Sequence, residues 1–137
     1  GFPGMRVMQF AFGDNARNPY LPHNFGRCTV AYTGTHDNNT TVGWWANASE
    51  NERQAARQYL GPVTDSDIHW AMIQSLSQSV ANTLFVPFQV VLGLDGQHRM
   101  NTPGQPEGCW SWRFAWADVS DEPARRLSSM VRAHGRA

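Results

Sequence analysis

The stretch that decides the fold is CTVAYT at residues 28–33, which runs directly into the polar turn GTHDNNTT at residues 34–41. A short run of β-branched and aromatic residues that ends in turn-forming residues is typical of a buried strand. We therefore expect a strand over residues 28–33. His36 and Asp37 would then lie just beyond its carboxyl end.

Three more segments outside this stretch have the composition of strands. We predict strands over Met5–Phe12, which follows a Pro-Gly turn, over Leu84–Phe88, and over the Trp-rich segment Trp110–Trp116. Residues 13–25 contain two prolines that follow Asn18 and Leu21, so this segment is expected to be a long loop.

Helical patterns separate the later strands. Ser49 with Glu52 forms a capping box, and Gly61-Pro62 ends that helix. The next helix is predicted from Thr64 or Ser66, with a buried stripe of residues spaced four apart: Ile68, Met72, Leu76 and Val80. Residues 89–96 suggest a short helix or turn and residues 99–107 a loop. A last helix opens at Asp121 or Glu122 with Pro123.

Strands that alternate with helices predict an α/β fold with a parallel sheet. A closed (β/α)8 barrel needs eight strands and typically about 250 residues, whereas this chain has 137. The chain is therefore either a small open sheet or part of a TIM barrel. The long loops after the strands favour the barrel, because barrel enzymes build their sites there.

Composition excludes several classes of function. Apolar residues make up 41% of the chain, yet no run approaches the roughly 20 that a membrane-spanning helix needs, so we expect a cytoplasmic protein that binds no membrane. The net charge is zero and no basic face precedes the arginines near the end, which argues against nucleic acid. Every basic residue is Arg, so Schiff-base chemistry and a P-loop lysine are excluded.

Nucleophilic catalysis also finds no support. Cys28 and Cys109 lack CxxC spacing, and we expect them to be small buried residues with reduced thiols. No GxSxG elbow occurs. Five histidines are present without HxH or HExxH spacing, although His23 could approach His36 and Asp37 as a metal ligand. His69 is expected at the surface or at the rim of the core.

His36 and Asp37 carry the clearest chemical signal. A carboxylate at a strand end can stabilise an oxocarbenium-like transition state and bind sugar hydroxyls, while a neighbouring His binds another hydroxyl. The alternative is a polar turn in which Asp37 or Asn38 caps the following helix. Glycoside chemistry normally needs two carboxyl groups, and neither Asp14 nor Glu107 is a convincing partner.

Aromatic residues are consistent with a carbohydrate ligand, because sugar rings stack on aromatic faces. Those near loops or strand ends are Phe10, Phe12, Trp44, Trp45, Trp110 and Trp112. Packing in the core is the better interpretation for each individual Trp.

Several motifs, taken in order, resemble one family. They are GFPGMRVMQFAF at residues 1–12, NPYLPHN at 18–24, YTGTHDN at 32–38, RMNTPG at 99–104 and CWSWR at 109–113. Together they resemble the 4-α-glucanotransferases of the amylomaltase type (disproportionating enzyme), which belong to the α-amylase clan. The resemblance covers essentially the whole chain.

This resemblance implies that residues 1–137 are the C-terminal portion of a decorated TIM barrel, incomplete as it stands. Asp37 would be the family's third carboxylate, which stabilises the transition state. His36 and Asn38 would bind the same sugar, Asn101 would lie in a loop near it, and Phe10 and Phe12 would wall the site. No metal or organic cofactor is implied.

The family's nucleophilic Asp and its acid/base Glu belong to motifs that precede anything in this chain. The parent enzyme would transfer α-1,4-glucan segments between maltooligosaccharides by a retaining mechanism, and the chain alone would be inactive. It would self-associate or form a complex with the missing N-terminal part, because a partial barrel exposes sheet edges. The alternative is a non-catalytic module that binds α-glucans or has a structural role.

Overall fold

A computed structural model describes residues 1–136 of the chain. Its sheet is parallel, with strands β1 (Gly4–Val7), β2 (Thr29–Tyr32) and β3 (Thr83–Phe85) in the order β1-β2-β3. The predicted central strand and the predicted parallel sheet are therefore confirmed. Val7, Tyr32 and Phe85 stand side by side in the register, so the three strands end at the same edge.

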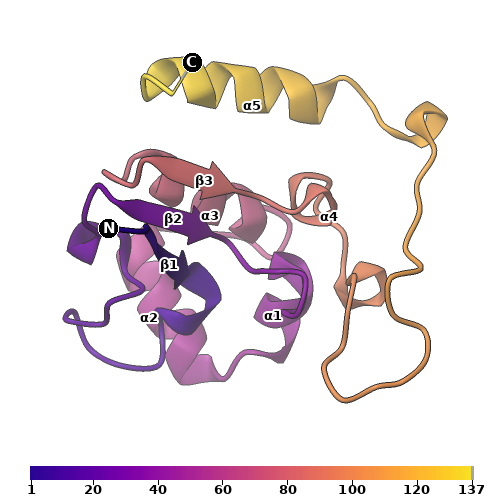
Figure 1. The fold of residues 1–137 in the computed structure, drawn as a ribbon, viewed down its shortest axis with the longest axis horizontal. Helices are drawn as coiled ribbons and strands as arrows, with labels where there is room; N and C mark the ends of the chain where they lie inside the picture. Colours follow the sequence, from indigo (N-terminus) through magenta and orange to yellow (C-terminus); the bar gives the residue numbers. More distant parts are fainter. Residues whose placement is uncertain (137) are drawn as a thin grey trace.

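In sequence order, α-helices of the described residues occur between β2 and β3 and again after β3, as the colours of Figure 1 show. The α-helices are α1 (Thr41–Asn47), α2 (Glu50–Leu60), α3 (Ile68–Ser77), α4 (Phe88–Val91) and α5 (Glu122–Ala133). Short 3-10 turns occur at Met8–Phe10, Pro22–Asn24, Gly96–His98 and Trp116–Asp118.

The predicted helix signals around α2 and α5 are confirmed. Ser49 accepts a hydrogen bond from the amide of Glu52, whose carboxylate accepts one from the amide of Ser49 in return. Gly61 follows α2 with a φ of 87°, a conformation that favours glycine. Helix α5 begins at Glu122, with Pro123 in its first turn.

The first strand is shorter than predicted. It stops at Val7, and the chain turns through Met8–Phe10 instead of continuing to Phe12. This turn gives Met8, Ala11 and Phe12 a helix-like spacing, and all three enter one core cluster. A straight strand would have placed Ala11 on the opposite face from the other two.

Three other predictions about the elements need correction. Helix α1 follows the polar turn directly; it was not among the predicted elements, and only the alternative in which Asp37 or Asn38 caps the following helix implied it. Helix α3 ends at Ser77, so Val80 lies outside it and is half exposed. Residues 110–116 form no strand, because they run away from the sheet towards α5 and have no strand edge to pair with (Figure 1).

Two side-chain predictions are also wrong. Cys28 is exposed, and its thiol is free like that of the half-buried Cys109. His69 is buried rather than at the surface, because it lies on the inner side of α3 beneath Gly93. A Cβ atom at Gly93 would come within 2.9 Å of the His69 ring, so the backbone there approaches the imidazole closely.

Within the described residues the helices pack on one face of the sheet, whereas the other face is largely open and has Val7 as a buried residue. Ala31 and Leu84 lie on this covered face, against a cluster that includes Ile68, Met72 and Leu76 of α3. A second cluster joins α3, α4 and α5 through Trp70, Val90 and Met130. The opposite, open face carries the half-buried Tyr32, stacked on the exposed Phe85, and the exposed Met5.

Candidate active site

An open pocket of about 520 Å³ lies where β2 and β3 end. The turn after β2 forms one wall with His36 and Asp37, and the loop after the Gly96–His98 turn forms another with Arg99 and Trp110. Tyr32 and Phe85 of the open face contribute an apolar wall. Ligands of parallel α/β sheets bind at this end of the strands, so the location fits a functional site.

The turn at residues 35–38 is closed by its own side chains. The carbonyl oxygen Oδ1 of Asn38 accepts hydrogen bonds from the amide of Thr35 at 2.8 Å and from its hydroxyl at 2.9 Å. Asn38 thus holds the turn that carries Asp37. The N-cap of α1 is Thr40, whose hydroxyl accepts from the amide of Gly43. The alternative in which Asp37 or Asn38 caps that helix is therefore wrong.

The end of β1 anchors the other side of the turn. The side-chain amide of Gln9 donates to the carbonyl of Asn39 at 2.7 Å. A Cβ atom at Gly34 would lie 2.6 Å from the same amide nitrogen, so only glycine leaves room for this contact. Gln9 is almost fully buried, which makes its hydrogen bond costly to lose.

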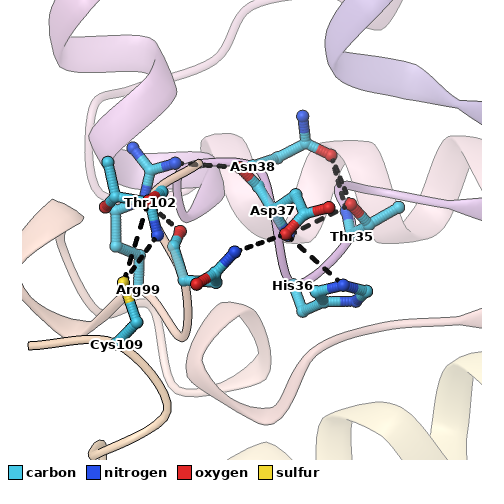
Figure 2. Close-up of polar contacts among 8 residues, drawn as sticks. Thr35, His36, Asp37, Asn38, Arg99, Thr102 and Cys109 are labelled. Carbon is cyan, nitrogen blue, oxygen red and sulfur yellow. Dashed lines mark hydrogen bonds and ion pairs between the residues drawn. The ribbon is translucent and has the colours of Figure 1, made fainter. Parts of the chain in front are cut away.

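Asp37 is the one acidic side chain among the described residues that line this pocket. Its carboxylate is about half exposed, and Oδ1 accepts a hydrogen bond of 2.6 Å from the side-chain amide of Asn101. The imidazole nitrogen Nε2 of His36 lies 3.4 Å from the same oxygen. None of the side-chain hydrogen bonds within residues 1–136 uses Oδ2, so this oxygen of a pocket-lining residue has acceptor capacity left for a ligand (Figure 2).

The loop at residues 99–110, which we call the late loop, is tied to the turn by hydrogen bonds to backbone carbonyls. Nη2 of Arg99 donates to the carbonyl of Asp37 at 2.9 Å, and Nε donates to the carbonyl of Asn101 at 2.9 Å (Figure 2). The amide of Asn101 donates to the carbonyl of His36 at 3.1 Å. The structure thus brings together His36, Asp37 and Asn101, as the sequence predicts.

The loop closes on itself beyond Asn101. The amide of Trp110 donates to the carbonyl of Met100 at 2.7 Å, and the thiol of Cys109 lies within hydrogen-bonding distance of the Thr102 backbone. Trp110 has a φ of 59°, and its ring packs on that of His36 with 5.0 Å between centroids. Neither Arg99 nor Trp110 was named as a site residue, although Arg99 opens the RMNTPG motif that pointed to Asn101 and Trp110 was among the aromatics considered for a sugar ligand.

Several candidate residues lie elsewhere. Phe10 is half exposed and meets Tyr20 edge-on, while Phe12 is buried against Trp44. Neither phenylalanine lines the Asp37 pocket. Trp45 is fully buried, and its indole N–H donates to Asp65 at 2.6 Å.

The histidine that could have approached the site also lies apart from it. The ring nitrogens of His23 contact the hydroxyl of Tyr59 and the carbonyl of Ala16. Within residues 1–136 no group of three or more His, Cys, Asp or Glu side chains is arranged to hold a metal ion. In the same part of the chain, no helix has both the length and the apolar character to cross a membrane.

The parallel sheet and the pocket at the carboxyl ends of its strands define an α/β protein with a candidate ligand site at that edge. Comparison with known proteins identifies the family. The sequence profile of the 4-alpha-glucanotransferases matches residues 1–119, and the chain belongs to this family. The resemblance seen in the motifs is thereby confirmed.

Individual relatives belong to the same family. The chain is 44% identical over 136 residues to a 4-alpha-glucanotransferase of Synechocystis sp., and 43% identical over 141 residues to that of Thermus thermophilus. These matches cover 98% and 97% of this chain but 27% and 28% of the relatives. The chain therefore spans about a quarter of their length.

A solved structure gives the same result for the fold. The amylomaltase from Streptococcus agalactiae in complex with acarbose superposes with a TM-score of 0.92 at 30% sequence identity. The superposition covers 98% of this chain and 27% of that protein. The arrangement of helices and strands in this chain is thus similar to that of a segment of an amylomaltase.

Proposed function

We propose that this chain is a segment of a 4-α-glucanotransferase in which Asp37 stabilises the transition state of glucan transfer. One observation carries the proposal: a half-exposed carboxylate lines the pocket at the carboxyl end of β2, with Asn101 bound to one oxygen and no side-chain hydrogen bond of residues 1–136 to the other. The substrates proposed are α-1,4-glucans and maltooligosaccharides. His36 would bind the same sugar unit.

The proposed reaction is a double displacement that retains the configuration at C1. A nucleophilic carboxylate bonds to C1 while the glycosidic C1–O bond breaks and an acid gives its proton to the departing oxygen. The hydroxyl of a second glucan then displaces the carboxylate and returns the proton to the acid. Both steps build positive charge on the sugar, which the negative charge of Asp37 stabilises.

The chain alone is proposed to be inactive. A retaining mechanism uses two carboxyl groups about 5 to 5.5 Å apart, whereas Asp37 is the acidic residue that the described part of the chain brings to this pocket. The nucleophile and the proton donor would come from a part of the enzyme that corresponds to the rest of the relatives' sequences, outside the match to this chain. Turnover of maltotriose by the pure chain would contradict this.

The proposed architecture is the C-terminal portion of a (β/α)8 barrel. Its support is the parallel order of β1, β2 and β3, and the apolar side chains of Met5 and Phe85 on the open face. Further strands would pair with the outer edges of β1 and β3. Without them the chain should self-associate, and light scattering of the pure chain at high concentration tests this.

A test of the role of Asp37 needs a polypeptide of the relatives' full length that contains this chain, which we call the long form. Asp37→Asn keeps the size of the side chain but removes its charge, and should lower kcat by about 100-fold to 1000-fold. Asp14→Asn is the matched control, because Asp14 is exposed and lies outside the pocket. Near-normal turnover by Asp37→Asn would remove Asp37 from the mechanism.

A second candidate function is a non-catalytic glucan-binding module, which the exposed aromatic side chains of Trp110, Phe114 and Trp116 favour. Calorimetry of the pure chain with maltooligosaccharides separates the two. Binding that is lost in Trp116→Ala and unchanged in Asp37→Asn would support the module. Binding that depends on Asp37 would support the site proposed above.

A further inference from the structure

We propose that Arg99 is a positioning residue that holds the carboxylate of Asp37 in place by joining the backbone of the turn after β2 to that of the late loop. This inference rests on the proposed role of Asp37. Arg99 and Asp37 are 62 positions apart, and the guanidinium of Arg99 donates to one carbonyl in each segment.

The geometry of the guanidinium suits this task. Its N–H groups lie in one rigid plane and point in fixed directions, so two carbonyls bound to it are held in a fixed relation to each other. Here Nη2 binds the carbonyl of Asp37 and Nε that of Asn101, both at 2.9 Å. A lysine has one nitrogen in place of this fork and cannot reproduce both directions.

The two carbonyls belong to Asp37 and Asn101, the residues whose side chains make the contact that fixes the carboxylate. Asn101 donates from its side chain to Oδ1 of Asp37 at 2.6 Å and from its backbone to the carbonyl of His36 at 3.1 Å. Arg99 therefore closes a ring of hydrogen bonds that runs through the backbone of both segments. Within the described residues, loss of Arg99 would leave the loop hydrogen-bonded to the turn only through Asn101, by its side chain and its backbone amide.

The guanidinium of Arg99 binds backbone carbonyl oxygens and not the carboxylate of Asp37. None of the ion pairs found within residues 1–136 includes Arg99, although it lies in the pocket beside Asp37. Its guanidinium binds carbonyl oxygens, which leaves Oδ2 of Asp37 available to a sugar hydroxyl. An arginine that paired directly with the carboxylate would instead occupy the oxygens that the substrate needs.

Arg136 provides a matched control. Its guanidinium also binds backbone carbonyls, those of Leu76, Ser77, Ser79 and Ala81, but it does so at the end of α3, outside the pocket. Substitution of either arginine removes hydrogen bonds of the same kind. Only substitution of Arg99 should change the catalytic rate of properly folded enzyme.

The test compares Arg99→Ala, Arg99→Lys and Arg136→Ala in the long form. Arg99→Ala should lower kcat by tenfold to about 100-fold with little change in KM, because a shift of the carboxylate by about 1 Å weakens transition-state contacts most. Millimolar guanidinium chloride, but not sodium chloride, should restore part of the kcat of Arg99→Ala. Arg99→Lys should lie between wild type and Arg99→Ala.

A double-mutant cycle shows whether Arg99 acts through Asp37. If it does, the variant with both Arg99→Ala and Asp37→Asn should be no slower than Asp37→Asn alone, because residues that act as a unit are not additive. Additive losses would overturn the inference, since they indicate a general structural role. A kcat within twofold of wild type for folded Arg99→Ala would overturn it as well.

Failure of the two proposals can be distinguished. Near-normal turnover by Asp37→Asn contradicts the proposed function, whatever Arg99 does. An inactive Asp37→Asn beside a normal Arg99→Ala contradicts this inference alone. If Arg99→Ala does not fold, hydrogen exchange of the pure chain carrying Arg99→Lys decides: the amides of Asn101 and Trp110 should exchange faster while those of α2 do not, and unchanged exchange overturns the inference.

Discussion

The two faces of the parallel sheet differ in what their apolar side chains do. On the covered face, Ala31 and Leu84 pack against α3, and the residues that meet them are fully buried. On the open face, Met5 and Phe85 are about half exposed and line the Asp37 pocket. The covered face thus stabilises the fold, whereas the open face builds the site and is available to further parts of an enzyme.

The largest expected difference between the faces is in stability. Leu76→Ala on the covered side should lower the free energy of unfolding by about 2 to 5 kcal/mol, because it leaves a cavity in the core. Met5→Ala on the open face should change it by about 0.5 kcal/mol or less. Urea unfolding of the pure chain measures both, and equal losses would contradict the comparison.

A smaller loss of stability is expected from substitution of the buried Trp45. Trp45→Phe removes the indole N–H that donates to Asp65 at 2.6 Å within the covered side, and should cost about 1 to 3 kcal/mol. The control is Trp116→Phe, since Trp116 is 73% exposed and its indole makes no hydrogen bond within residues 1–136. A loss in the control as large as that in Trp45→Phe would show that indole hydrogen bonding is not the cause.

The smallest expected effect is a dependence on pH from the buried His69. Burial lowers its pKa below the ordinary 6.5; Asp67 opposes this shift and Arg126 adds to it. The unfolded chain therefore takes up this proton first as the pH falls. The contribution of neutral His69 to the free energy of unfolding is complete above about pH 6.5 and decreases below it until the pH reaches the folded pKa.

The variant His69→Leu should reduce this loss of stability between pH 7.5 and pH 5, measured by urea unfolding. His134→Gln is the control, because His134 lies after α5 and is not fully buried. An unchanged pH dependence in His69→Leu would contradict a lowered pKa of His69 in the folded chain and assign the pH dependence to another group.

Local signals in the sequence were sufficient for part of this structure. Three signals depend on neighbouring residues and are confirmed. They are the strand predicted at residues 28–33 and observed at Thr29–Tyr32, the capping box at Ser49, and the helix with Pro123 in its first turn. The alternating aromatics of residues 110–116 suggested a strand, but a strand also needs a partner edge, which local composition does not reveal.

In the candidate site, too, local sequence was sufficient to predict some residues but not others. His36 and Asp37 are recognisable because they follow a strand, and the motif around Asn101 pointed to the same site. The contacts of Arg99 and Trp110 with the turn depend on loop closure over more than 60 residues. The side chain of Asn38 was expected to bind substrate, yet its oxygen already closes the turn with Thr35.

The hydrogen bond between the amide of Trp110 and the carbonyl of Met100 makes the intervening residues a closed loop with a narrow neck. Residues 103–108 at its tip are all exposed, while Arg99 and Asn101 lie at or near the neck. Length changes at the tip should therefore leave the carboxylate undisturbed. The tip offers protein engineers a place to insert additional ligand-binding segments beside the pocket.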